Sequence, residues 1–99
     1  MRNHPVREPQ IREFLAAVGE NEPDAFRAEK MALRILQDLP DRSRKMVLLR
    51  YGIGTGISWT LQEIGLEFGL TRERVRQILR TSLEKLVKRQ RRKESRERA

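Results

Sequence analysis

The fold is decided by residues 60–78, TLQEIGLEFGLTRERVRQI. Thr60 and Glu63 have the spacing of a capping box, in which each side chain hydrogen-bonds to the backbone of the other at a helix start. Gly69 is expected to end this first helix, because glycine readily adopts left-handed backbone. A second helix is expected from Thr71 onward. Two helices joined by a tight glycine turn predict a helix-turn-helix.

The residues between these landmarks fit the packing of that motif. Gly65 stands where the two helices are expected to cross most closely, so a small residue is needed there. The apolar positions that pack the second helix onto the first are Ile64, Phe68, Leu70, Val75 and Ile78. Helical spacing then places a polar set on the opposite side of the second helix, which consists of Arg72, Glu73, Arg76, Gln77 and Arg80.

This polar set has the chemistry of a major-groove reader. Arginine can bind guanine with two hydrogen bonds, glutamine can bind adenine, and a carboxylate can accept from cytosine N4. Glu73 would be repelled by phosphate, so we interpret it as a base reader; the alternative is that it only stabilises the helix N-terminus. Arg74 is expected to turn sideways, toward phosphate or toward an acid of the protein.

The N-terminal part is expected to be a tail followed by a short helix. Residues 1–10 contain two prolines and almost no apolar pattern, which indicates a mobile tail or the end of a linker. Ile11, Phe14, Leu15 and Val18 follow helical spacing, and Gly19 is a plausible stop. This helix over residues 11–18 either packs onto the chain's own core or docks another protein.

Two more helices are expected before the motif. Residues 21–24 (NEPD) have helix-start chemistry, and an apolar stripe from Ala28 to Leu39 follows, down to Pro40, which should end the helix. A third helix is expected over about residues 42–51, capped by Asp41 or Ser43.

The segment 51–59, YGIGTGISW, contains three glycines in five residues, which excludes regular helix. We interpret it as a connector held to the core by Ile53, Ile57 and Trp59. A phosphate-binding loop is rejected, because the P-loop pattern and a preceding strand are both missing.

Charge is concentrated at the C-terminal end. The chain of 99 residues has a net charge of +8 and a pI of about 11. Residues 71–99 hold twelve basic and four acidic side chains, which account for the whole excess and favour a polyanionic partner. The last segment, KRQRRKESRERA (88–99), is either a solvated mobile tail or a source of additional phosphate contacts.

Composition excludes several classes of function. The chain has no cysteine, so it forms neither disulfides nor zinc–thiolate sites. His4 is the only histidine, and Glu63 and Glu67 lack a third ligand, so neither an enzyme nor a metal or other cofactor is expected. The longest apolar run, residues 46–49, is far too short to span a bilayer. We therefore expect a soluble, cytoplasmic protein without membrane contact.

Two strings, LPDRSRKMVLLRYGIG (39–54) and WTLQEIGLEFGLTRERVRQI (59–78), resemble region 4 of the sigma-70 family of bacterial sigma factors. The resemblance covers about residues 23–88. It implies that the domain binds the promoter −35 element, and that a hydrophobic surface on the earlier helices holds the flap tip of the RNA polymerase β subunit. An anti-sigma protein or another regulator is a further partner of this kind of domain. LuxR-type regulators share the LP-x-R opening but lack the long connector and the string TRERVRQI.

The resemblance also assigns roles to residues. Arg72, Glu73, Arg76 and Gln77 match base-reading and groove-lining positions, and Arg42, Thr60 and Leu61 match positions at the DNA backbone or groove edge. The complete set of candidate DNA-binding residues is Arg42, Thr60, Leu61, Thr71, Arg72, Glu73, Arg74, Arg76, Gln77 and Arg80. Some positions depart from the family pattern. Gln62 replaces an acid of the primary factors, and Thr81 and Glu84 interrupt the basic surface that housekeeping members show to activators, although Lys85 keeps it in part.

The sequence thus predicts an all-α fold of about five helices without strands or repeats. We divide it into a tail and short helix (1–22), a helix-turn-helix domain of the sigma region 4 type (23–88) and a basic C-terminal tail (89–99). The expected function is sequence-specific binding to a −35-type promoter element with double-stranded DNA and RNA polymerase core as partners. The alternative is an interaction module that binds polymerase or an anti-sigma protein without reading DNA. The aromatic-rich domain that melts the −10 element is missing, so the chain is interpreted as a domain, a free-standing regulator or half of a split factor.

Overall fold

The computed structural model describes residues 7–20 and 24–98. These residues form five helices and no strand, which confirms the all-α expectation. The helices are α1 (Ile11–Ala17), α2 (Ala25–Leu36), α3 (Asp41–Tyr51), α4 (Leu61–Phe68) and α5 (Arg72–Arg98). None of the described helices is both long and apolar enough to cross a membrane.

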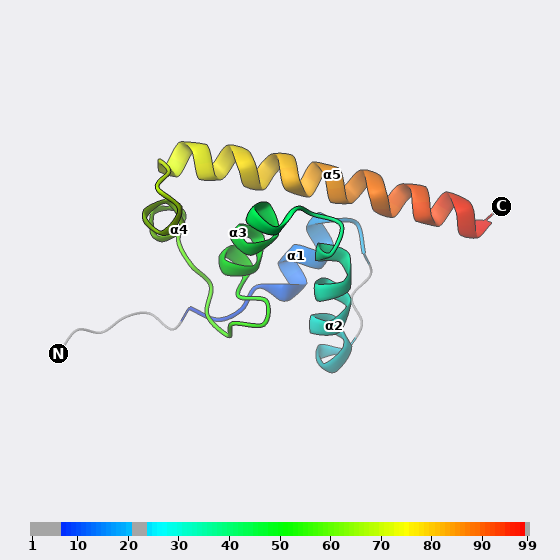
Figure 1. Cartoon of the computed structure of the whole chain (residues 1–99). Coiled ribbons are helices and arrows are strands. Elements are labelled where there is room, and N and C mark those ends of the chain that lie inside the picture. The colour runs from blue at the N-terminus through cyan, green and yellow to red at the C-terminus, as the bar shows by residue number, and fades with distance from the viewer. Residues whose placement is uncertain (1–6, 21–23, 99) are drawn as a thin grey trace.

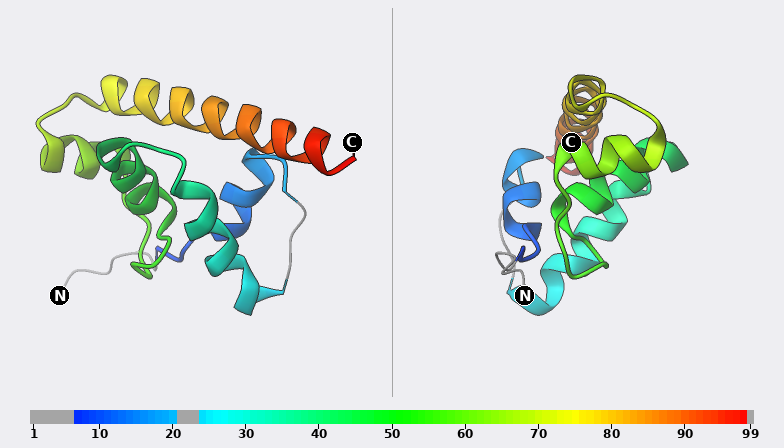
Figure 2. Two further views of the ribbon diagram at one scale, coloured as in Figure 1. Left: turned by 45° about the vertical axis from the view of Figure 1, so that its right-hand side comes forward. Right: turned by 90° about the vertical axis from the view of Figure 1, so that its left-hand side faces the viewer.

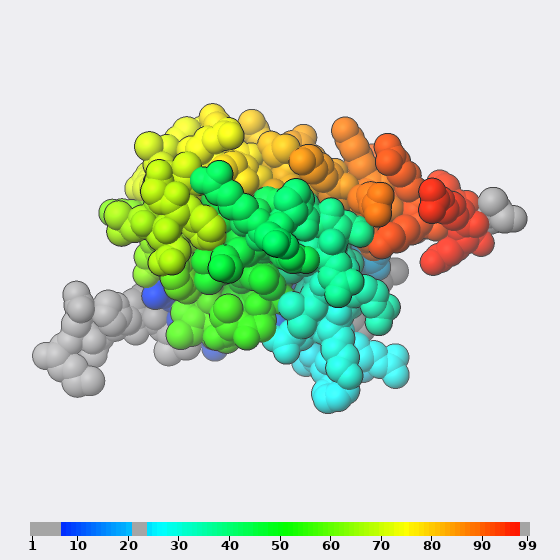
Figure 3. All heavy atoms as spheres, in the orientation of Figure 1, coloured from blue at the N-terminus to red at the C-terminus, as the bar shows by residue number. Residues whose placement is uncertain are grey.

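The long helix α5 lies across the other four helices. In Figure 1 it runs along one side of the molecule, with α4 at its N-terminal end and α1 to α3 beside its middle. The left view in Figure 2 also shows α4 beneath the N-terminal end of α5. The last turns of α5 extend past the body of the molecule, as the space-filling view shows (Figure 3).

A single hydrophobic core joins all five helices. Its members are spread along the chain, from Phe14 in α1 to Leu86 in α5, and both side chains are fully buried. Phe14 also contacts the Tyr51 ring with a centroid distance of 5.6 Å. Leu15 and Val18 are buried beside it. The short helix therefore packs onto the chain's own core, which was the first of the two readings given for it.

The second helix begins as predicted but ends earlier. The Asp24 side chain accepts a hydrogen bond of 3.0 Å from the Arg27 N–H and caps α2, whereas residues 21–23 lie outside the described part of the chain. The helix ends at Leu36 rather than at Pro40. A residue that precedes proline is disfavoured in helical backbone, so the last residues before Pro40 form turns and only Leu39 still packs into the core.

The predicted caps of the third helix are wrong. Pro40 occupies the cap position, with extended backbone at φ −58° and ψ 155° and no capping side chain. Asp41 is the first helical residue and pairs with Arg44 one turn on, where a carboxylate suits the positive end of the helix dipole. The Ser43 hydroxyl donates to the Pro40 carbonyl, at 3.2 Å.

The glycine-rich connector is held to the core at two of its three predicted positions. Ile53 is fully buried and Trp59 packs against the core, while the Trp59 N–H donates to the Leu49 carbonyl at 2.8 Å. Ile57 is half-exposed, so its predicted anchoring role is wrong. Its backbone instead closes around Gly52, where a Cβ atom would lie 3.0 Å from the Ile57 carbonyl carbon.

The end of the predicted N-terminal tail is part of the structure. The Gln10 N–H donates to the Tyr51 carbonyl at 2.7 Å, and the Arg7 carbonyl accepts from the Ser58 N–H at 3.2 Å. Residues 7–10 are thus attached to the connector, which contradicts a mobile tail for this part. Residues 1–6 lie outside the described chain.

The final helix is longer than predicted. A basic C-terminal tail was predicted over residues 89–99, but α5 continues to Arg98. The segment is rich in good helix formers, and its first part has tertiary contacts. The buried Gln90 side-chain amide donates to the Glu20 carboxylate, and Asp38 accepts from Arg89 at 3.4 Å and from Lys93 at 3.3 Å.

Candidate nucleic-acid interface

The helix-turn-helix begins with the predicted capping box. The Glu63 N–H donates to the Thr60 hydroxyl at 3.1 Å, and the Thr60 N–H donates to the Glu63 carboxylate at 2.8 Å. The Arg7 guanidinium also donates to that carboxylate. The Arg7 bond, followed by the backbone bond from Thr60, lowers the pKa of Glu63 below its ordinary value. The start of α4 is therefore fixed from two sides.

The angle between α4 and α5 depends on two glycines. A Cβ atom on Gly65 would lie 2.4 Å from the Leu70 carbonyl oxygen, which leaves no room for any side chain. Gly69 ends α4 with φ 70°, in the left-handed region that glycine adopts easily. The Leu70 N–H then donates to the Gly65 carbonyl at 2.8 Å. Both predicted roles, close crossing and left-handed turn, are confirmed.

Thr71 starts α5 with its side chain as well as its backbone. Its hydroxyl oxygen accepts from the Arg74 N–H at 3.0 Å, and its carbonyl accepts from the Val75 N–H at 3.0 Å. This is the geometry of an N-cap. Thr71 thus aligns the first turn of the helix that carries the other candidate residues.

The predicted division of α5 into an apolar and a polar side is correct. Val75 is fully buried and Leu79 is 6% exposed, and both pack into the core. The residues opposite them are exposed, with Gln77 partly covered. We call this exposed set the reading face; it consists of Arg72, Glu73, Arg76, Gln77 and Arg80.

Side chains of the reading face form hydrogen bonds with one another. Arg76 donates to both carboxylate oxygens of Glu73, at 3.0 and 2.5 Å, and Gln77 approaches the same carboxylate at 3.5 Å. The Arg76 hydrogen bond is the main reason that the pKa of Glu73 is lowered, and the same pair raises the pKa of Arg76. Arg74 donates to the Gln77 side-chain oxygen at 3.4 Å. The expectation that Arg74 turns toward phosphate or an acid stays a prediction.

A shallow hollow beside the reading face collects further candidates. Thr60, Leu61 and Arg72 line it together, so the structure places the start of α4 next to the start of α5. Arg50 also lines this hollow, and its guanidinium donates to the Trp59 carbonyl at 3.0 Å. Sequence reasoning missed Arg50, although a basic residue at the end of α3, just before the connector, was a usable signal. Arg42 is exposed on the first turn of α3 and does not line the hollow.

The described residues contain no group of three or more histidine, cysteine, aspartate or glutamate side chains placed to hold a metal ion. His4, the only histidine of the sequence, lies outside the described residues.

Comparison with known proteins identifies the domain. The sequence profile of the family described as "Sigma-70, region 4" matches residues 35–88. The RNA polymerase sigma factor SigA of Clostridium acetobutylicum is 48% identical over 63 residues, which cover 63% of this chain and 17% of that protein. The chain thus spans about a sixth of the length of this relative. No solved structure matches the chain significantly.

The matched segment contains every candidate DNA-binding residue, from Arg42 to Arg80, as well as the two glycines of the turn. It also contains most of α5 and all of α3 and α4. More than half of the chain therefore matches the sequence profile of this family, and the helix-turn-helix lies within the matched segment. The chain belongs to the Sigma-70, region 4 family, a family of non-enzymatic DNA-binding domains of transcription sigma factors.

Proposed function

We propose that this chain binds a −35-type promoter element through its reading face and does so beside RNA polymerase core. The observation that carries the proposal is the exposed cluster of Arg72, Glu73, Arg76 and Gln77 on the first turns of α5. In helix-turn-helix proteins, the N-terminal residues of the second helix contact base edges in the major groove. The four residues have both the position on the helix and the side-chain chemistry for such contacts.

Binding would exchange contacts within the protein for contacts with DNA. Glu73 and Arg76 are paired on an exposed surface, where an ion pair contributes little to stability and is easily rearranged. On a promoter, Glu73 would accept from a cytosine N4, while Arg76 would turn to a guanine or to a phosphate. Because the two side chains already lie one turn apart, they would meet neighbouring base pairs.

The surroundings of the reading face suit the phosphate backbone. Thr60, Arg50 and Arg72 line the hollow beside it and supply a hydroxyl and two guanidinium groups. Arg42 and Arg80 are also exposed. Phosphate contacts of this kind fix the register of a protein on the duplex, and base contacts supply the sequence preference.

A different surface is available for the polymerase. Phe26 is 78% exposed and Leu33 is 41% exposed, and both lie on the outer side of α2. Their spacing of seven residues, two helical turns, places both side chains on one face of α2. We propose this α2 surface as the contact for the β flap, and an anti-sigma protein would compete for it.

A sigma-type function would also mean that the chain acts in the cytoplasm.

DNA titrations at rising salt concentration test the proposal. A −35-like duplex should keep its advantage over a scrambled duplex as salt rises, because counterion release weakens both duplexes alike. Arg76→Ala should relax the preference at one base pair by about tenfold. Arg92→Ala is a matched control, because it removes an exposed arginine of α5 outside the reading face. Equal weakening of all duplexes by Arg76→Ala would show that Arg76 does not read bases.

The exposed α2 surface also favours a second candidate function, a polymerase-binding module that does not read DNA. A pull-down with polymerase core and with the β flap alone separates the two. The double variant Phe26→Ser and Leu33→Ser should lose the flap and keep its preference for the −35-like duplex. A chain that binds the flap but has no duplex preference at any salt concentration would support the second candidate.

A further inference from the structure

Residues 7–10, which we call the N-terminal strap, lie along the connector that leads into the helix-turn-helix. Two backbone hydrogen bonds attach them. The Ser58 N–H donates to the Arg7 carbonyl at 3.2 Å, and the Gln10 N–H donates to the Tyr51 carbonyl at 2.7 Å. One bond is at each end of the strap, so its backbone is fixed along its whole length.

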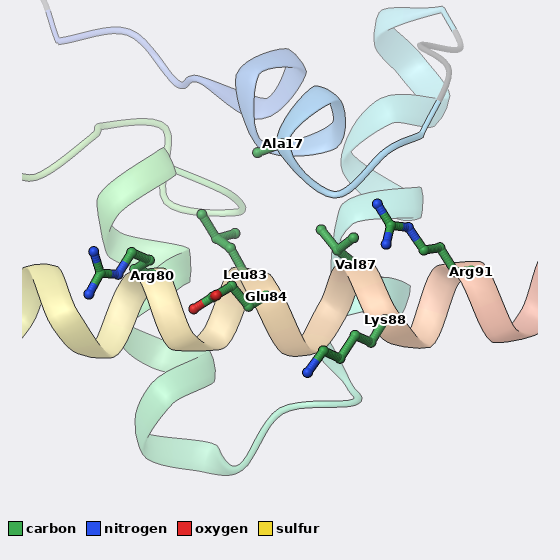
Figure 4. A pocket seen from close by; sticks show the side chains of 7 residues that line it. All are labelled: Ala17, Arg80, Leu83, Glu84, Val87, Lys88 and Arg91. Atoms are coloured by element: carbon green, nitrogen blue, oxygen red, sulfur yellow. The ribbon is translucent and has the colours of Figure 1, made fainter.

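The helix that follows the strap is itself anchored. Phe14 and Leu15 of α1 are fully buried in the core. In Figure 4, Ala17 at the end of α1 points toward Leu83 and Val87 of α5. A side chain of the strap is therefore only a few residues away from the core, and its contacts hold one part of the domain against another.

The Arg7 side chain extends from the strap to the first turn of α4. Its guanidinium donates to Glu63 Oε1, which is the same carboxylate oxygen that accepts from the Thr60 N–H at 2.8 Å. The Arg7 side chain is 35% exposed and that of Glu63 is 41% exposed, and ion pairs in such positions contribute little to stability. The consequence of this pair is therefore the orientation of Glu63 rather than the stability of the fold.

A fixed Glu63 also fixes Thr60. The Glu63 N–H donates to the Thr60 hydroxyl oxygen at 3.1 Å. A hydroxyl group can accept and donate at once, so Thr60 keeps its proton for an oxygen outside the protein. Thr60 lines the hollow beside the reading face together with Arg50 and Arg72. The contact with Arg7 thus determines how a hydroxyl group faces that hollow.

We propose that Arg7 is a positioning residue for DNA binding, which holds Glu63 and thereby aligns Thr60 and the start of α4 with the phosphate backbone. Arg7 does not line the hollow of Thr60 but lies with Glu67 in a different one, so it acts through Glu63 and not on DNA. Arg7 also precedes the segment that matches the family profile, residues 35–88. The inference rests on the proposed function, in which Thr60 meets a phosphate.

Affinity of the full chain for the −35-like duplex tests this role. Arg7→Ala should weaken binding by about threefold to tenfold, as for the loss of one hydrogen bond. The slope of log affinity against log salt should stay the same, because no cation leaves the DNA interface. Arg7→Lys still donates to Glu63 and should restore most of the affinity. The control, Arg34→Ala, removes an exposed arginine of α2 and should change the affinity by less than about twofold.

A double-mutant cycle shows whether Arg7 acts through Glu63. Glu63→Gln keeps a side chain that can close the capping box but loses the charge that pairs with Arg7. In this background, Arg7→Ala should weaken duplex binding by less than about twofold.

Hydrogen exchange without DNA gives a second readout of the same contact. Arg7→Ala should speed exchange of the Thr60 and Glu63 amides, whose hydrogen bonds belong to the capping box. Exchange of the Val75 amide in α5 should not change. Equal acceleration at all three amides would mean that Arg7 only stabilises the fold, and would overturn the positioning role.

Two outcomes of the duplex titrations would also overturn it. The first is an equal loss from Arg7→Ala with Glu63 and with Gln at that position, together with a salt slope that is shallower by about one unit, which would make Arg7 a direct phosphate contact. The second is unchanged affinity in Arg7→Ala when the wild type does prefer the −35-like duplex. A wild type without that preference would contradict the proposed function itself, and the inference with it. Faster exchange at Thr60 would in that case show that the error lies in the function and not in the contact.

Discussion

The two ends of α5 are both positively charged, but their charged side chains have different partners. At the near end, residues 72–80, the main partner of Arg76 is Glu73 of the same helix. At the far end, residues 88–98, Arg89 and Lys93 bind Asp38, which lies 51 and 55 residues earlier in the chain. One set of contacts is local and the other joins distant segments.

This difference assigns different roles to the same residue types. A pair within one helix can open without moving any other element, so the near end can exchange partners when a ligand arrives. The bonds to Asp38 attach α5 to the turn between α2 and α3, so breaking them loosens the packing of the helix. We therefore expect the arginines of the near end to serve binding, and Arg89 and Lys93 of the far end to serve structure.

The largest effect is expected for Gly65→Ala, which disturbs the packing of α4 against the start of α5. Its Cβ atom would meet the Leu70 carbonyl oxygen at 2.4 Å, and backbone cannot move aside as a side chain can. We expect the free energy of unfolding in urea to fall by about 3 kcal/mol and the duplex preference to disappear. Gly69→Asn is the control, because asparagine tolerates left-handed backbone and nothing lies within 4 Å of that site. A loss no greater than that of the control would show that the crossing of α4 and α5 is not tight.

The far end is tested by truncation after Lys88. This removes Gln90 and its contact with Glu20 together with both cations on Asp38. The free energy of unfolding should fall by about 2 kcal/mol. If the far end is structural, the slope of log affinity for duplex DNA against log salt should stay the same. A slope that becomes shallower by about one unit or more would mean that the far end contacts phosphate, which was the other reading of the basic segment.

Asp38→Asn tests the same contacts with a smaller change, because it removes only the negative charge that pairs with Arg89 and Lys93. Burial raises the pKa of the Asp38 carboxyl, but the hydrogen bonds and charges of Arg89 and Lys93 lower it by more, so the pKa lies below its ordinary value. The variant should lose about 1 kcal/mol of unfolding free energy at neutral pH.

The pH dependence of that loss follows from the lowered pKa. The contribution of Asp38 is fully present above the pKa of the unfolded chain, about 3.9, and disappears as the pH falls through the lower folded value. The difference between the wild type and Asp38→Asn in urea unfolding should therefore be full at pH 7 and should shrink as the pH falls below about 4. A constant difference down to pH 2 would contradict the ion pair.

The smallest effect on folding is expected at Glu73. Glu73→Gln leaves an exposed position with a side chain of the same shape, so the melting temperature should change by less than about 2 °C. Preference for a cytosine at one duplex position should nevertheless decrease, because the carboxylate acceptor is lost. A large drop in melting temperature with unchanged preference would reverse the roles that we assign to the two ends.

The parts of the fold that sequence predicted well depend on local contacts. The capping box at Thr60, the close crossing at Gly65 and the left-handed turn at Gly69 each involve residues within a few positions of one another. Helical spacing also placed Val75 inside and Arg76 outside. The Glu73–Arg76 pair is local as well, and its i, i+3 spacing would have allowed its prediction.

The parts that were missed depend on distant partners or on competition between local signals. The continuation of α5 rests partly on Asp38 and Glu20, far away in sequence. At Pro40, a residue expected to end one helix instead occupies the cap position of the next. Ile57 has the hydrophobicity of an anchor, but the tight path of the glycine-rich connector turns it outward.

The continuity of α5 has a mechanical consequence. At 27 residues and 1.5 Å per residue, the helix is about 40 Å long, and one continuous helix joins the near end to the residues that bind Asp38. The tight contact between Gly65 and Leu70 lies next to the N-terminal end of α5. We therefore expect the helix to turn about this contact. A small tilt imposed at the other end would thus change the direction in which Arg72 and Arg76 point. Contacts at the C-terminal end of α5 thus influence the orientation of the side chains at its N-terminal end.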